Sequence, residues 1–231
     1  MLTLLKMYSV MIPVANYGTL ALVEIGLFVL LPLFYSSPIE IGGLGLPPPI
    51  IGTFLATFGI VDGTVQALFA AKIIERIGAK TVFCSAVLSF YPLIILFPIM
   101  SVIVIAQGKV GPIIWTLLAV QLIFMVLIDL AYSAYVQSLG NQRSHVRRIA
   151  TIFIFVTRAA PNKQSLGSTN GLSQSLTSIA RAIGPALTTS LFAVSKEYNV
   201  LGGNLVYIIL AILTTILVVL SQRLPDLEDE E

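Results

Sequence analysis

The chain has 231 residues, of which 57% are hydrophobic and only 10% are charged, and its net charge is +2. Soluble domains carry roughly 25% charged residues, so a water-facing globule of this length would lack a polar coat. The 13 Lys and Arg residues are scattered between apolar blocks, which excludes the basic face of a nucleic-acid-binding protein. The composition therefore predicts a membrane protein that is surrounded by lipid.

The single cysteine, Cys84, and the single histidine, His145, restrict the available chemistry. A disulfide within the chain needs two cysteines, and a multi-histidine metal centre needs more than one histidine. A membrane-embedded enzyme would need a nucleophile with its base, or several metal ligands. We therefore expect no metal, no cofactor and no enzymatic activity.

Apolar runs that can cross a bilayer, which takes ~20 helical residues, occur six times along the chain. The N-terminal run exceeds the ~7–15 residues of a signal-peptide core, so we expect it to remain as the first span. Pro92 and Pro98 are expected to bend the third span. We predict an all-α polytopic membrane protein, a single transmembrane domain over 1–231, with spans at about 8–35, 50–73, 81–106, 111–137, 166–194 and 201–220.

Two segments belong to no predicted span. The apolar segment Ile149–Val156 has eight residues, too few to cross a bilayer, and it follows the polar loop 138–148. An acidic tail over 222–231 ends the chain, and we expect it to be solvated.

The basic residues are divided unequally between the two sides of the predicted bundle. Lys109 and Lys196 lie on one side, and ten lie on the other: Lys6, Lys72, Arg76, Lys80, Arg143, Arg147, Arg148, Arg158, Lys163 and Arg223. The positive-inside rule then places both termini and both basic loops in the cytoplasm. The membrane concerned is either the plasma membrane or the vacuolar membrane.

Four charged residues, Glu24, Asp62, Asp129 and Arg181, fall within predicted spans. Each costs ~2.5–3.5 kcal/mol at the centre of a helix in lipid, so they are expected to face a partner or water. Glu24, Asp62 and Arg181 lie near the midplane and are the candidate substrate-cavity or coupling residues. Asp129 lies closer to the cytoplasmic end, and we interpret it as a polar contact between helices.

The fifth predicted span carries a polar stripe. Asn170, Gln174, Thr177 and Arg181 follow one another at i, i+4, i+7 and i+11, which places them on one side of a helix. Such a stripe lines a cavity or a polar helix contact, so all four are site candidates. Gly167 and Gly171, then Ser178 and Ala182, have the small-xxx-small spacing that permits close approach by a neighbouring helix.

Three further features complete the candidate set. Gln66 follows Asp62 at i+4 on the second span, and Asn16 precedes Glu24 by eight residues on the first. Gln66 and Asn16 are cavity candidates, and the alternative interpretation is that they form polar contacts between packed helices. Gly184-Pro185 is predicted to break the helix beyond Arg181.

The hairpin 71–80 resembles the signature G-x-x-x-D-R-x-G-R-K that major facilitator superfamily transporters carry after the second helix of each half. Ala71 replaces the first glycine and Glu75 replaces the aspartate. The resemblance implies a gating hairpin with Glu75, Arg76, Gly78 and Lys80 as its functional positions. Gly78 is also expected to be needed for such a short turn.

Other segments resemble fungal twelve-span drug:proton antiporter-like facilitators of this superfamily, in chain order. Residues 11–17 and 38–46 are similar to their helix seven and the following loop, and residues 157–163, 166–174 and 178–186 are similar to their helix eleven. The resemblance implies the C-terminal half of the major facilitator fold, built from two inverted three-helix repeats. It also implies that an N-terminal six-helix half, or a second half-bundle, is needed as a partner.

One segment, 135–151, interrupts this resemblance. In the resembled family helix ten runs directly into the segment similar to 157–163, and joining Ala134 to Ile152 restores that continuity. We therefore predict that 135–151 is an anomalous insertion, translated from a retained intron or produced by an error in the gene structure. Sequencing of spliced transcripts that contain the segment would reject this prediction.

The predicted function is secondary, proton-coupled transport of small organic solutes across a lipid bilayer. A midplane carboxylate suits proton coupling because its protonation changes the cost of facing lipid or cavity, with Arg181 as a counter-charge. The alternatives are a truncated fragment or pseudogene product without transport, and a half-transporter that acts only as an oligomer. A channel is disfavoured because the sequence has neither an arginine ladder nor a repeated pore loop.

Overall fold

The computed structural model describes residues 7–130 and 165–224, and every regular element in these residues is a helix. This agrees with the predicted all-α membrane fold. The elements, in chain order, are α1 (Tyr8–Ser36), η2 (Ile39–Ile41), α2 (Pro48–Val65), η3 (Gln66–Ala70), α3 (Ala71–Ile77), α4 (Ala79–Leu88), α5 (Phe90–Gln107), α6 (Pro112–Asp129), α8 (Leu166–Glu197) and α9 (Leu205–Gln222).

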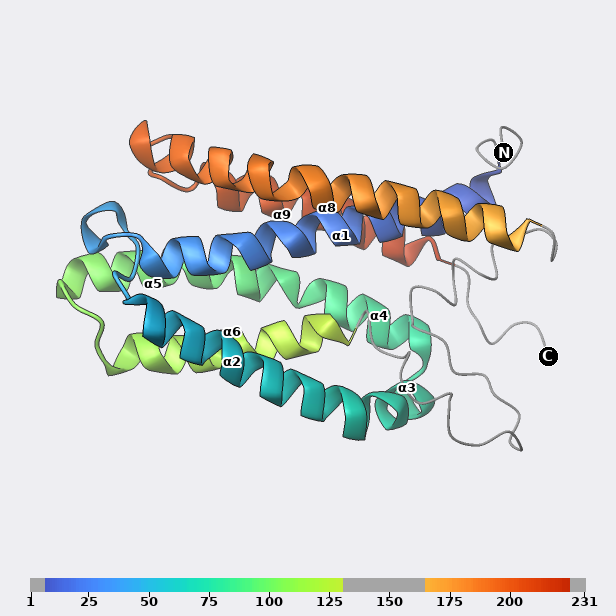
Figure 1. Ribbon diagram of the computed structural model, residues 1–231, viewed down its shortest axis with the longest axis horizontal. Helices are drawn as coiled ribbons and strands as arrows, with labels where there is room; N and C mark the ends of the chain where they lie inside the picture. Colours follow the sequence, from blue (N-terminus) through green and yellow to red (C-terminus); the bar gives the residue numbers. More distant parts are fainter. Residues whose placement is uncertain (1–6, 131–164, 225–231) are drawn as a thin grey trace.

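The long helices run side by side as one elongated bundle, and the start of α1 and the end of α9 lie at the end that carries α3 (Figure 1). Helix α1 packs against α8 and α9, while α5 packs against α6 and α9. Helix α2 contacts mainly α6 among the long helices. The first and last described helices begin and end on the same side because the number of helical crossings between them is even.

Five stretches are long and apolar enough to cross a membrane: Val10–Ser36, Pro48–Ala70, Lys80–Gln107, Pro112–Asp129 and Leu205–Gln222. Helix α8 has 32 residues, so it is also long enough to span, but its polar residues lower its hydropathy. It lies along α1 for most of its length (Figure 1). Lipid-facing apolar helices and one polar helix therefore make up the bundle.

Proline and glycine set several helix boundaries. Pro48 and Pro112 lie in the first turns of α2 and α6, where a missing N–H costs nothing. The third predicted span is divided at Ser89 into α4 and α5, because Pro92 has no N–H to donate to the carbonyl of Leu88. Gly78 turns the chain between α3 and α4 with φ of 90°, which confirms the expectation that a glycine is needed there.

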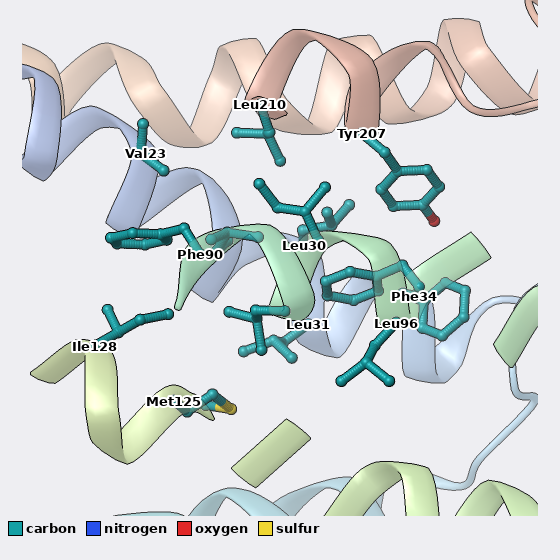
Figure 2. Packing of buried hydrophobic residues seen from close by; sticks show 14 of the residues in the cluster. Val23, Leu30, Leu31, Phe34, Phe90, Leu96, Met125, Ile128, Tyr207 and Leu210 are labelled. Carbon is teal, nitrogen blue, oxygen red and sulfur yellow. The ribbon is translucent and has the colours of Figure 1, made fainter. Parts of the chain in front are cut away.

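The core is apolar and rich in aromatic side chains. Phe97 of α5 packs edge-on against Phe34 of α1, with ring centroids 5.1 Å apart, and stacks on Tyr207 of α9 at 5.5 Å. Figure 2 shows Leu30, Leu31 and Phe34 of α1 among residues of α5, α6 and α9. Helix α1 therefore forms the centre of the bundle.

Glycines allow α1 and α8 to pack closely. A Cβ added to Gly18 would lie 2.6 Å from Leu176, and one added to Gly184 would collide with Ile25. The predicted break at Gly184-Pro185 is wrong, because α8 continues through Pro185 to Glu197. Because Pro185 has no N–H, only one backbone hydrogen bond of the helix is lost. Gly184 provides the surface on which α1 packs.

Some predicted features differ from the structure or lie outside it. Helix α9 begins at Leu205, four residues after the predicted start of the sixth span, because Asn199, Leu201 and the following two glycines have positive φ. The predicted insertion 135–151, the segment Ile149–Val156 and the segment 157–163 lie outside the described residues, as do residues 225–231 of the acidic tail.

Replacing Gly184 with leucine should destabilise the α1–α8 contact, because the new side chain overlaps Ile25. Overpacking of this kind costs about 1–3 kcal/mol, so the thermal unfolding midpoint in detergent should fall by several degrees. Gly171→Leu is the matched control, because nothing lies within 4 Å of an added Cβ there. Equal midpoints for the two variants would contradict the packing described.

Candidate functional site

Glu24 of α1 and Arg181 of α8 form an ion pair near the middle of both helices. The Nη2 atom of Arg181 lies 3.6 Å from Oε2 of Glu24, and the two side chains are 50% and 16% exposed, respectively. The structure therefore brings together two residues that the sequence placed on different spans at similar depth. Arg181 supplies the counter-charge that a carboxylate at this depth needs.

Asp62 and Gln66 form a second polar pair, on α2. Nε2 of Gln66 donates a hydrogen bond of 3.2 Å to Oδ1 of Asp62, so their i, i+4 spacing is used as expected. Gln66 also begins η3, a single π-helical turn that interrupts the regular α-helix. Such turns occur often at functional sites, because they redirect side chains from the preceding helix.

Asp129, the last residue of α6, belongs to the same polar region. Its carboxylate interacts electrostatically with those of both Asp62 and Glu24. The sequence interpretation of Asp129 as a polar contact between helices did not name these neighbours, because they depend on which helices pack together. The charge of Asp129 thus interacts with carboxylates on two other helices.

A small cavity lies against Glu24, on its inner side. The space open to the centre of a water molecule is about 10 Å³, which is room for roughly one water. Its other walls are apolar side chains of α1, α5 and α6, among them Leu31, Phe90, Met125 and Ile128 (Figure 2). Glu24 therefore lies between a guanidinium group and a space of molecular size in the core.

The polar stripe of α8 runs along the border between its buried and exposed sides. Thr177 is 2% exposed, and its Oγ1 has no hydrogen-bond partner among the described residues. Gln174 and Arg181 are exposed, and Asn170 is half-buried. Thr177 thus packs inside the bundle, while the side chains of Gln174 and Arg181 are exposed on its surface.

Asn16 differs from the other candidates because it is completely buried. Neither of its amide atoms has a hydrogen-bond partner among the described residues. A buried amide without a partner costs on the order of 1–3 kcal/mol, and this cost distinguishes Asn16 from a satisfied packing residue. Its role as a cavity residue remains a prediction.

The predicted gating hairpin has an exposed basic side and a glycine turn. Arg76 is exposed and Lys80 is half-buried, and both flank Gly78. The backbone of Glu75 lies in α3, and its side chain lies outside the described part.

Two polar contacts escaped the sequence analysis. The hydroxyl of Tyr35 donates a hydrogen bond of 2.7 Å to Oε1 of Gln121, which joins α1 to α6 inside the core. The ammonium group of Lys196 lies 5.8 Å from the ring centre of Phe192 and 6.0 Å from that of Tyr207. For Gln121 the available signal was a lone polar residue in an apolar run, which did not reveal its partner.

The described residues contain no group of three histidine, cysteine or acidic side chains suited to a metal ion. Cys84 is a free thiol whose Sγ lies 4.0 Å from the hydroxyl oxygen of Ser221. The polar contacts that the structure shows at mid-depth are the Glu24–Arg181 ion pair and the Asp62–Gln66 hydrogen bond.

A double-mutant cycle on Glu24→Gln and Arg181→Gln should measure the ion pair directly. Each single variant removes one partner of the ion pair, so the double variant should be more stable than the sum of the single effects predicts. The expected coupling is about 1 kcal/mol or more, measured by thermal unfolding in lipid nanodiscs. Additive effects would show that the two groups do not interact.

No protein-family model matches the chain, and no solved structure matches it. Curated relatives do match. A major facilitator superfamily multidrug transporter of Aspergillus fumigatus is 28% identical over 199 residues, which cover 82% of this chain and 29% of the relative.

Two major facilitator-type transporters match as well. The protein from Psilocybe cyanescens is 30% identical over 77% of this chain and 32% of its own length, and that from Psilocybe cubensis is 28% identical over 81% and 34%. The chain spans about a third of the length of these relatives. The matches agree with the helical fold and its five membrane-crossing stretches, and the chain belongs to the major facilitator superfamily of membrane transporters.

Proposed function

We propose that the chain is the C-terminal half-bundle of a secondary, proton-coupled transporter of small organic solutes, and that it acts together with a second six-helix half. The observation that carries the proposal is the Glu24–Arg181 ion pair, with Arg181 half exposed at mid-depth. A guanidinium group that faced lipid there would cost free energy. In the proposed assembly Arg181 therefore faces the second half or a water-filled gap between the halves.

The surface of α2 supports a second half. Only 11% of the α2 span is buried, against 56% for α1, so α2 has almost no cover in this bundle. Most of its exposed residues are small, including Gly52, Thr57, Gly59 and Gly63, although Ile60 is 72% exposed. An added Cβ at any of these glycines meets nothing within 4 Å. Small residues are typical of helix–helix contacts in membranes.

Helix α5 provides the contrast within the same chain. Its exposed residues are large and apolar, as expected for a helix that faces acyl chains: Ile95, Ile99, Val102 and Ile105. Gly167 and Gly171 of α8, like the glycines of α2, have open space beside them. The predicted close approach at these two glycines is therefore assigned to the second half, not to a helix of this bundle.

The proposed proton coupling rests on the charge balance at Glu24. The deprotonated carboxylate pairs with Arg181, whereas a protonated Glu24 would release Arg181 for other partners. A change in protonation would then change which arrangement of α1 and α8 is favoured, as a two-state carrier requires. Asp129 would contribute to this balance, because its charge interacts with that of Glu24.

The orientation remains the one that the basic residues predict, with both termini in the cytoplasm. In this orientation α3 and its hairpin lie at the cytoplasmic end of the bundle (Figure 1). The solute site would then lie at the level of Glu24 and Arg181, between the two halves.

Neutralising the positions equivalent to Glu24 and Asp62 in a full-length relative should abolish most proton-driven uphill transport, with a loss of roughly tenfold or more. Exchange of solute across the membrane without a proton gradient should persist, because exchange requires the solute-binding site but no coupling to proton movement. Labelled-solute flux in proteoliposomes measures both activities. Glu40→Gln, in an exposed loop, is the control, and unchanged uphill flux in the other variants would disprove the coupling role.

The second half can be tested by co-purification. We expect the N-terminal half of a full-length relative, expressed separately, to be retained by this chain, and Gly63→Leu or Gly171→Leu to reduce recovery severalfold by filling the contact surface. Val102→Leu, on the lipid-facing side of α5, is the control. Failure of the unmodified chain to retain that half would favour the alternative of a non-transporting fragment.

A further inference from the structure

A groove with a mixed basic and apolar lining lies at the end of α2, away from the carboxylates. The residues that line it are Phe69, Lys72, Ile73, Arg76 and Ile77. They are spaced at i, i+3, i+4, i+7 and i+8, which places them on one side of the helix through η3 and α3. The groove has about 660 Å³ of space open to the centre of a water molecule, enough for a substantial ligand.

The groove lies at the level of the membrane expected for the lipid headgroups. The membrane-crossing stretch of α2 ends at Ala70, so Lys72 and Arg76 follow within two turns and lie at the level of lipid headgroups. Both basic side chains are exposed. Phe69 and Ile77 are also 49% and 52% exposed, so apolar surface is available beside the charges.

The charge of the hairpin is positive. Lys72, Arg76 and Lys80 contribute three positive charges and Glu75 one negative charge, which leaves a formal charge of +2. A phosphate group matches this pair of side chains well, since arginine binds it with two parallel hydrogen bonds and lysine adds a point charge. Basic residues at this depth attract anionic lipids of the adjoining leaflet.

We propose that this groove binds an anionic phospholipid. The phosphate and headgroup lie between Lys72 and Arg76, and an acyl chain runs along Phe69, Ile73 and Ile77. A soluble anion would use the two charges but leave Phe69 and Ile77 exposed to water. A lipid covers both parts at once, which is why the groove favours a lipid over a free phosphate.

The test uses the 231-residue chain in detergent, with native mass spectrometry to count retained lipids. Phosphatidylglycerol should be retained at least tenfold better than phosphatidylcholine of the same chain length. In Lys72→Gln/Arg76→Gln this preference should disappear, because each basic residue contributes about fivefold. Lys72→Arg/Arg76→Lys should keep most of it, and Lys109→Gln, exposed at the other end of the bundle, should not change it.

Two further measurements distinguish binding of a lipid from binding of free phosphate. Inorganic phosphate at the same concentration should not displace phosphatidylglycerol, and Ile77→Gln should weaken lipid retention while the charges remain. Helical circular dichroism and size-exclusion profiles confirm that each variant is folded, and the comparison of headgroups on the unmodified chain needs no variant. Equal retention of the two lipids, displacement by phosphate, or full preference in the charge-neutralised variant would overturn the proposal.

Discussion

The close packing of α1 against α8 is the contact on which the rest of the bundle depends. Gly18 on α1 and Gly184 on α8 lack side chains where the partner helix approaches, so the helices lie near enough for Glu24 and Arg181 to pair. A larger side chain at either glycine would separate the helices and weaken the ion pair between Glu24 and Arg181. Packing and electrostatics are therefore coupled in this contact, because the short distance between α1 and α8 allows both the close packing and the ion pair.

The remaining helices divide into two kinds of surface around this contact. Large exposed residues on α5, such as Ile99 and Val102, suit acyl chains. Small residues on α2 and open glycines on α8 leave a surface that lipid tails would fill less well than another helix. The carboxylate of Asp129 on α6 interacts electrostatically with those of Glu24 on α1 and Asp62 on α2. The proposal of a second half-bundle gives these surfaces and charges one explanation.

At the end of the bundle opposite α3, Tyr35 bonds to Gln121, and Lys196 lies over the rings of Phe192 and Tyr207. Gly42 and Gly203 leave room around the ammonium group of Lys196. The Tyr35–Gln121 bond joins α1 to α6, and Gly42, which follows η2, lies close to Lys196 of α8. Segments from both halves of the chain therefore meet at this end.

By itself, the sequence determined the solvent, the helices and the depth of each charged residue, because hydropathy and helical period depend only on local composition. It placed Glu24, Asp62 and Arg181 at mid-depth and required a turn at Gly78. Only the tertiary structure decided which helices are neighbours, since contacts between distant segments leave no periodic signal in one sequence. It therefore paired Glu24 with Arg181, brought Asp129 to the other carboxylates and kept α8 continuous through Pro185.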